Sequence, residues 1–125
     1  MAADVPRVYT LIRQATKRGK ILKRSLEEIH SAIHHFWVLE RENRLVACCA
    51  LEIYNKKLAE VRSLAVEVKE EKQGLATILL RHCLKEAKTK GVYEVLAITD
   101  RENLFKRLGF SEQLQGQKAL FLRNR

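Results

Sequence analysis

The chain has 125 residues, of which 46% are hydrophobic, and a chain of this size buries enough surface for one core but not for two domains. We therefore expect a single domain over residues 1–125. The 24 lysines and arginines against 15 acidic residues give a formal net charge of +9, which predicts an anionic partner: nucleic acid, a membrane surface or a polyanionic cofactor. No long apolar run and no signal-peptide pattern occur in the sequence, which favours a cytoplasmic protein without a membrane span.

The three cysteines do not form a recognisable site. Cys48, Cys49 and Cys83 are odd in number, lie in apolar surroundings and lack Cys-x-x-Cys spacing. Neither a disulfide framework nor a zinc site fits that pattern. We interpret them as core thiols of a reducing compartment.

The N-terminal part of the chain predicts two helices. Apolar residues recur at helical spacing over residues 4–16, where Asp4 can cap the helix and Pro6 is tolerated in its first turn. A basic segment, residues 17–24, then predicts a loop. Ser25 and Glu28 form a capping box that opens a second, short helix.

Three strands are predicted next, over residues 36–40, 45–54 and 58–68, because these stretches are apolar and β-prone and are separated by polar turns. An antiparallel meander follows from the short turns. In the third strand, simple alternation places two sets of residues on opposite faces. These sets are Val61, Ser63 and Ala65 on one face, and Arg62, Leu64 and Val66 on the other.

The second half of the chain predicts a long helix followed by a strand, a short helix and a last strand. The long helix spans residues 73–90, carries one apolar stripe and ends at Gly91. A strand over 94–99, a helix over 101–108 closed by Gly109, and a strand over 119–122 complete the chain. The element order αα, βββ, α, β, α, β predicts an α+β fold.

The loop that leads into the long helix is a candidate anion site. Residues 70–77 connect a strand to a helix N-terminus, where unpaired backbone N–H groups and the helix dipole attract an anion such as a pyrophosphate. Gly74 allows a close backbone approach and Ala76 leaves room, but the segment is not a Walker motif. An ordinary loop that caps a core helix is the alternative.

The element order, this loop-helix junction and the segment 104–110 together resemble the GNAT acetyltransferase family over nearly the whole chain. The segments 21–25 and 59–66 are similar to signatures of the amino-acid acetyltransferases of the N-acetylglutamate synthase type. The resemblance implies an α+β (three-layer α/β) fold with a mixed, mostly antiparallel central sheet flanked by helices. The family's first strand is missing from this chain.

The resemblance also implies acetyl-CoA as cosubstrate, and a set of binding residues. Backbone groups of Leu64 and Val66 would hold the acetyl and pantetheine arm, and Phe105 would line the thiol end. Arg24 would grip the carboxylate of an amino acid, as a guanidinium fork is suited to do, with Ser63 at the substrate face and Lys118 as the C-terminal basic residue. The residues implied to cradle the pyrophosphate are Lys72, Gln73, Gly74, Ala76 and Thr77. Glu71 departs from the family, which has Gln or Arg there.

Acetyl transfer to an amine requires a base, a donor to the developing oxyanion and an acid for the departing thiolate. The N–H groups of Leu64 and Ala65 are candidates for the oxyanion donor. Glu60 or Glu52 is a candidate base, and Tyr54 is a candidate acid. A water relayed to a backbone carbonyl is the alternative to a side-chain base.

The leading hypothesis is an acetyl-CoA-dependent N-acetyltransferase that acts on a small amino acid, L-glutamate first, as in arginine biosynthesis. Acetylation of another amine, such as a different amino acid, a polyamine or a peptide N-terminus, is an alternative within the same fold. A degenerate domain that binds CoA or a protein partner without turnover is another, and so is a nucleic-acid-binding module. The basic segment 17–24 lacks interleaved aromatic residues, which makes nucleic acid the weaker partner.

Two further expectations concern metals and assembly. His30 and His34 share a helical spacing, but no carboxylate or cysteine accompanies them, so we expect surface histidines and no metal. An exposed sheet edge would favour a homodimer.

Overall fold

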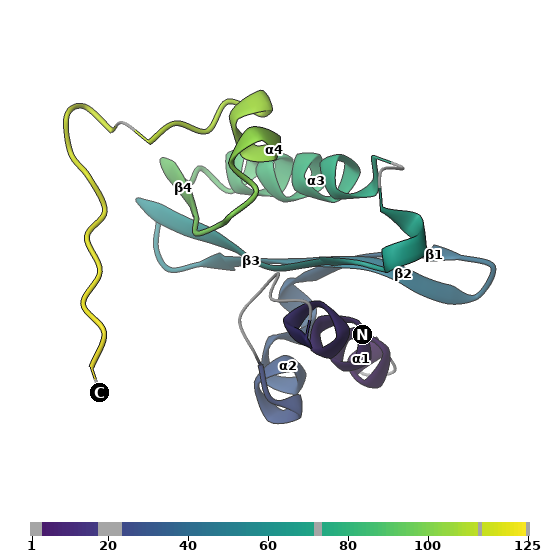
Figure 1. Ribbon diagram of the computed structural model, residues 1–125. Coiled ribbons are helices and arrows are strands. Elements are labelled where there is room, and N and C mark those ends of the chain that lie inside the picture. Colours follow the sequence, from purple (N-terminus) through teal and green to yellow (C-terminus); the bar gives the residue numbers. More distant parts are fainter. Residues whose placement is uncertain (1–3, 18–23, 72–73, 113, 125) are drawn as a thin grey trace.

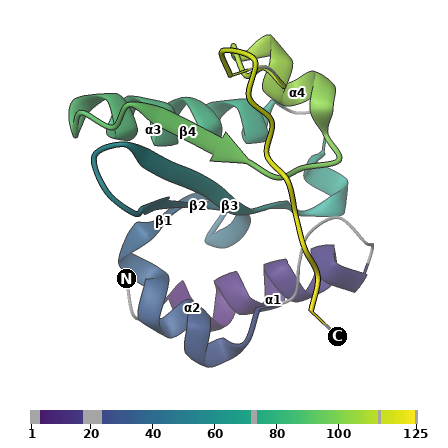
Figure 2. The same ribbon diagram turned by 90° about the vertical axis from the view of Figure 1, so that its left-hand side faces the viewer.

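The computed structural model describes residues 4–17, 24–71, 74–112 and 114–124. Within these ranges, helices cover both faces of a four-stranded sheet. Helices α1 (Val5–Lys17) and α2 (Leu26–Ala32) lie below the sheet in Figure 1, and α3 (Leu75–Thr89) and α4 (Glu102–Arg107) lie above it. Figure 2 shows the same three layers from the side.

The sheet has the order β1 (Phe36–Arg41), β2 (Arg44–Ile53), β3 (Leu58–Val66) and β4 (Glu94–Ala97). The pairs β1–β2 and β2–β3 are antiparallel and β3–β4 is parallel. Two short 3-10 helices, η2 (Ile33–His35) and η3 (Val68–Glu70), follow α2 and β3. The predicted mixed, mostly antiparallel sheet flanked by helices is therefore confirmed.

Each face of the sheet carries its own apolar core. The core beneath α3 includes Leu79, Leu80 and Cys83 of the helix, which pack on Leu51 and Val61 of the sheet. The core on the other face joins α1 and α2 to the sheet, and its members include Val8, Ile12, Ile29, Cys48 and Ala65. All three cysteines are buried and free, as the sequence predicts for core thiols.

The predicted capping box fixes the start of α2. The Glu28 backbone N–H donates to the Ser25 hydroxyl at 3.1 Å, and the Ser25 backbone N–H donates to the Glu28 carboxylate at 3.1 Å. Both contacts satisfy N–H groups that a helix start leaves unpaired. The residue before the cap, Arg24, contacts the two central strands β2 and β3.

The third strand contains a bulge that the predicted alternation did not include. Ala50 pairs with Arg62 and Cys48 with Ala65, so β3 advances three residues while β2 advances two. The extra residue lies at Ser63, whose φ is +57°. As a result Leu64 and Val66 join Val61 on the α3 face, and Ala65 turns to the α1 face. The prediction that Leu64 and Val66 share a face with Arg62 was wrong for this reason.

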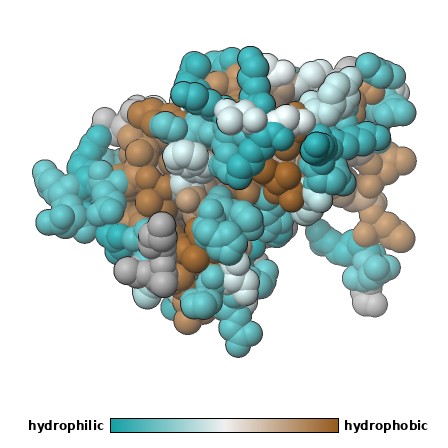
Figure 3. Space-filling view, turned by 180° about the vertical axis from the view of Figure 1, so that it is seen from behind, coloured by the Kyte–Doolittle hydropathy of each residue, from teal (hydrophilic) through white to brown (hydrophobic). Residues whose placement is uncertain are grey.

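The predicted last strand, residues 119–122, is not a strand in the structure. A turn with positive φ at Gln115 and Gly116 closes a single bridge between Leu114 and Gln117, and the chain beyond it does not pair with β4. It stands off the body at the right of Figure 3, with Leu120 and Leu122 each 88% exposed. A locally β-prone run cannot form a strand without a hydrogen-bonding neighbour.

Candidate active site

The sheet opens between β3 and β4. The two strands pair only over Leu58–Val61, whereas β3 continues to Val66. The Glu67 N–H donates to the Val46 carbonyl at 2.8 Å, so Ala65, two residues earlier, is hydrogen-bonded to β2 opposite Cys48. Backbone directions alternate along a strand, so the backbone groups of Leu64 point towards the opening instead. Leu64 is therefore better placed than Ala65 to donate to a group bound between β3 and β4.

The start of α3 lies at the same end of the sheet. Gly74 precedes the helix with φ +77°, a left-handed conformation that other residues adopt only with strain, and no side chain caps the helix. The first-turn N–H groups, including those of Ala76 and Thr77, have no acceptor within the helix. A Cβ at position 74 would meet no described atom within 4 Å other than those of its chain neighbours. Lys72 and Gln73 lie outside the described residues, as do residues 18–23 of the basic segment.

Arg24 is buried against the opposite face of the sheet, with only 7% of its surface exposed. Its Nη1 donates to the Ser63 hydroxyl at 2.9 Å and its Nη2 donates to a Glu52 oxygen at 3.4 Å. Its Nε has no hydrogen-bond partner and lies 4.0 Å from a Glu28 oxygen. The structure thus brings together two of the three residues predicted to bind the substrate, Arg24 and Ser63, at the bulge of β3.

Glu52 links Arg24 to a second arginine. One Glu52 oxygen accepts from Arg24, and the other accepts from Arg62 Nη1 at 3.0 Å. Burial alone would raise the pKa of Glu52, but the hydrogen bond from Arg62 and the charges of Arg62 and Arg24 lower it below its ordinary value. The carboxylate is therefore ionised at neutral pH and shields Arg24.

Tyr54 and Glu60, the predicted acid and base, are in direct contact. The Tyr54 hydroxyl donates to a Glu60 carboxylate oxygen at 2.5 Å. Burial, together with the hydrogen bond and the charge of Glu60, raises the pKa of Tyr54 to about 12. The phenol consequently keeps its proton across the physiological range and can act as a proton donor.

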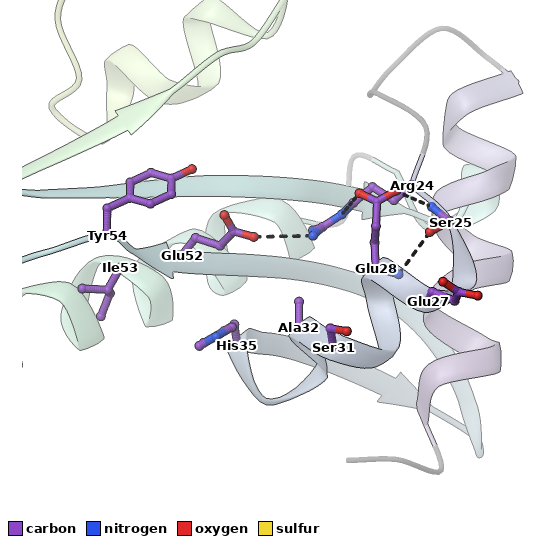
Figure 4. A pocket seen from close by; sticks show the side chains of 10 residues that line it. All are labelled: Arg24, Ser25, Glu27, Glu28, Ser31, Ala32, His35, Glu52, Ile53 and Tyr54. Atoms are coloured by element: carbon purple, nitrogen blue, oxygen red, sulfur yellow. Dashed lines mark hydrogen bonds and ion pairs between the residues drawn. The ribbon is translucent and has the colours of Figure 1, made fainter.

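A cleft of about 560 Å³ is lined by three of these residues, Arg24, Glu52 and Tyr54. Figure 4 shows Arg24 and Glu52 pointing towards each other at its wall, with α2 along its other side. Three carboxylates line the cleft, those of Glu27, Glu28 and Glu52, against the single guanidinium of Arg24. The wall that a ligand would meet is therefore acidic.

Phe105 and Lys118 lie elsewhere. Phe105 is 5% exposed and packs edge-on against Phe110 at 5.1 Å between ring centres, within the core beneath α3. Both Phe105 and Lys118 line a second cleft, between β4, α4 and the C-terminal segment. Neither Phe105 nor Lys118 lines the cleft of Arg24.

Sequence reasoning did not select Arg62 or Glu28 as site residues. Arg62 lies two residues after Glu60 on β3, on the face that Glu52 and Glu60 share, since Glu52 and Glu60 are cross-strand partners. Two carboxylates directly opposite each other on adjacent strands repel, and a nearby cation offsets that repulsion. The alternation of residues along β3 could therefore have identified Arg62 as a neighbour of Glu52 and Glu60.

The described part of the chain has neither a metal-binding cluster nor a membrane-spanning helix. It contains no group of three or more His, Cys, Asp and Glu side chains that could hold a metal ion. It also contains no helix long and apolar enough to cross a membrane.

The sequence is similar to known acetyltransferases. A family model described as the acetyltransferase (GNAT) family matches residues 6–110. An uncharacterized N-acetyltransferase of Chlorobaculum tepidum, CT2212, is 34% identical over 110 residues, which cover 88% of this chain and 71% of that protein. The amino-acid acetyltransferase of Pasteurella multocida is 31% identical over 110 residues, which cover 86% of this chain and 25% of that protein.

Solved structures show the same relationship. Rv2747 from Mycobacterium tuberculosis, in complex with CoA, matches with a TM-score of 0.84 and 26% identity, over 91% of this chain and 70% of that one. N-acetylglutamate synthase from Neisseria gonorrhoeae, complexed with CoA and N-acetyl-glutamate, matches with a TM-score of 0.82 and 28% identity, over 89% of this chain and 27% of that one. The chain thus spans about a quarter of the length of the matched synthase and of the Pasteurella enzyme.

Proposed function

This chain belongs to the acetyltransferase (GNAT) family, and we propose that it acetylates the amine of a small amino acid, with L-glutamate as the first candidate acceptor. Family membership and the relatives named N-acetyltransferase make it an acetyl-CoA-dependent N-acetyltransferase. The observation that carries the proposal of an amino-acid acceptor is Arg24, a buried guanidinium beside the β3 bulge. The similarity to a synthase that binds N-acetyl-glutamate supports L-glutamate.

The described residues fit acetyl-CoA at two places. The N-terminus of α3, with Gly74 in a left-handed conformation and no side-chain cap, leaves N–H groups for the pyrophosphate, and Ala76 and Thr77 belong to that first turn. The opening beyond Val61 leaves the Leu64 backbone for the pantetheine arm, with Val66 further along the same strand. Lys72 and Gln73 complete the proposed pyrophosphate loop.

In this proposal, Glu60 of β3 and Tyr54, the residue after β2, transfer protons, and the backbone of β3 stabilises charge. The thioester of acetyl-CoA provides an activated acetyl group. Glu60 accepts the proton that the attacking nitrogen gives up, and Tyr54 gives its proton to the departing thiolate and regains one from Glu60, to which it is hydrogen-bonded. The Leu64 N–H donates to the developing oxyanion. No covalent intermediate on the protein is needed.

Arg24 binds the acceptor's carboxylate in this proposal, with the Ser63 hydroxyl beside it. A guanidinium that already pairs with Glu52 must share its donors with the incoming carboxylate or exchange Glu52 for it. The Nε of Arg24 is buried and without a hydrogen-bond partner, so it can donate to the acceptor's carboxylate only once the Arg24 side chain moves. An α-amino acid thus places its carboxylate on Arg24 and its ammonium among the cleft's carboxylates.

A second acceptor class is favoured by the acidic lining of the cleft. Glu27, Glu28 and Glu52 outnumber Arg24, so an acceptor with a second positive charge gains attraction that a dicarboxylate does not. A diamine or a basic amino acid belongs to this class. Glu52 neutralises Arg24, so this carboxylate decides whether the cleft prefers L-glutamate or a cationic acceptor.

The substitution Glu52→Gln tests the acceptor class. Loss of the carboxylate frees Arg24, so we expect kcat/KM for L-glutamate to rise by about 10-fold, equivalent to about 1.4 kcal/mol. For a cationic acceptor, kcat/KM should fall by a similar factor. Steady-state kinetics with L-glutamate and with a diamine measure both changes. Equal effects on the two acceptors would refute Glu52 as the group that selects between them.

Other expectations from the sequence stay predictions. These are a cytoplasmic location, a homodimer, the absence of a nucleic-acid partner and a place in arginine biosynthesis. Lys118 as a substrate-binding residue is also a prediction. It requires a rearrangement of the C-terminal segment, because in this structure it lines the other cleft.

A further inference from the structure

Glu70 is a buried carboxylate that the proposed chemistry does not use. It is 7% exposed, and with Arg24 it is one of two buried charged residues in the described part of the chain. It lies in η3, between the end of β3 and Gly74. Burying a carboxylate costs free energy unless it is paired and hydrogen-bonded, so its position calls for an explanation.

The partners of Glu70 come from the β1–β2 turn. Arg41 Nη1 donates to both Glu70 oxygens, at 3.2 and 3.1 Å, and Arg44 Nη2 lies 3.5 Å from one of them. Between the two arginines, Glu42 and Asn43 both have positive φ, as in the tight turn that matches strand twist. The turn therefore holds both arginines towards Glu70.

The same ion pairs extend along the connection from β3 to α3. Arg44 also lies 3.3 Å from Glu67, whose N–H donates to the Val46 carbonyl. The Glu70 N–H donates to the Glu67 carbonyl at 2.8 Å and the Glu71 N–H to the Val68 carbonyl at 3.2 Å. Ion pairs with Arg41 and Arg44 thus join the β1–β2 turn to Glu67, just before η3, and to Glu70, its last residue.

We propose that Glu70 is a positioning residue for acetyl-CoA: by anchoring η3 to Arg41 and Arg44, it sets where the first turn of α3 meets the pyrophosphate. This inference rests on the proposed function, which places the cofactor's pyrophosphate at that turn. Glu70 itself does not touch the cofactor. Its effect is on affinity for CoA and not on the chemical step.

The test is the affinity of purified protein for CoA, measured by isothermal titration calorimetry, together with the KM for acetyl-CoA. For Glu70→Gln we expect both constants to rise about 10-fold, with kcat at saturating acetyl-CoA and the KM for the acceptor unchanged. Arg41→Gln, a change at a residue whose side chain is 47% exposed, should reproduce the effect without endangering the fold. The double variant should bind CoA no more weakly than Glu70→Gln alone, because Glu70→Gln already removes the contact with Arg41.

Glu86→Gln is the matched control. Glu86 lies on α3 and accepts from the Trp37 indole at 2.7 Å and from Lys90 at 2.8 Å, away from the connection to β3. Its loss should leave CoA affinity unchanged. Equal CoA affinity in the wild type, Glu70→Gln and Arg41→Gln would overturn the inference while leaving the proposed function standing. A wild type that does not bind CoA would contradict the proposed function itself, and with it this inference.

Discussion

Replacing Tyr54 with phenylalanine is expected to lower kcat by about 100-fold, the low end of what a positioned proton donor contributes. The phenol donates to Glu60 at 2.5 Å and is the acid proposed for the departing thiolate. Removing one hydroxyl leaves the sheet and the cleft in place. The acetyl-CoA KM should therefore stay the same, and steady-state kinetics at saturating acceptor measure the loss.

The pH dependence of kcat is a second test of Tyr54 as the proton donor. An unperturbed tyrosine loses its proton near pH 10, whereas the pKa of Tyr54 is raised to about 12. Because the acid works in its protonated form, the wild-type kcat should show no descending limb as the pH rises to about 10. Tyr93→Phe is the control, since Tyr93 is a 74% exposed tyrosine on the surface. A kcat for Tyr54→Phe equal to that of Tyr93→Phe would exclude Tyr54 as the acid.

Replacing Arg24 with alanine is expected to lower kcat/KM for an amino-acid acceptor by about 100-fold, or about 2.7 kcal/mol, since one charge-assisted contact with a carboxylate is lost. The KM for acetyl-CoA should not change, because Arg24 lies on the face of the sheet opposite α3. Arg24→Lys keeps the charge but not the two-pronged geometry, and should lose about 10-fold. Kinetics with L-glutamate and with acetyl-CoA varied in turn separate the two effects.

The folding stability of the Arg24 variants has to be measured separately from their kinetics. Removing one partner of a buried ion pair can cost about 3–5 kcal/mol, although Glu52 keeps Arg62 as a partner and so loses less. Thermal melts of Arg24→Ala and Arg24→Lys show whether the folded fraction limits activity. Arg13→Ala, at an exposed position on α1, is the control. Equal increases in the KM for the acceptor and in the KM for acetyl-CoA would contradict the role assigned to Arg24.

Local patterns were sufficient to predict most of the helices and strands. The apolar stripe of α3, its end near Gly91 and the Ser25–Glu28 capping box are all short-range features, and the structure contains each of them. Residues 119–122 show the limit of this reasoning. Their composition is typical of a strand, but a strand forms only where a neighbour accepts its hydrogen bonds, and composition does not supply that neighbour.

The site was predicted as separate residues and not as a network. Arg24 meets Ser63 and Glu52 across 39 and 28 residues, distances over which periodicity carries no information. The bulge at Ser63 also leaves no signal in an alternation that continues through it, yet it decides which face Leu64, Ala65 and Val66 occupy. Tyr54 and Glu60 were each candidates, but their contact depends on the register of β2 and β3.

The most direct measurement is a mass-spectrometric assay for acetylated product, with purified protein, acetyl-CoA, L-glutamate and a panel of other amino acids, diamines and a peptide N-terminus. Mass spectrometry is preferred because it identifies the acetylated product directly. We expect acetyl-CoA-dependent formation of an N-acetylated amino acid, with N-acetylglutamate above the rest of the panel. CoA binding without any acetylated product from the panel would contradict the proposed enzyme and favour a domain that binds CoA or a protein partner without turnover.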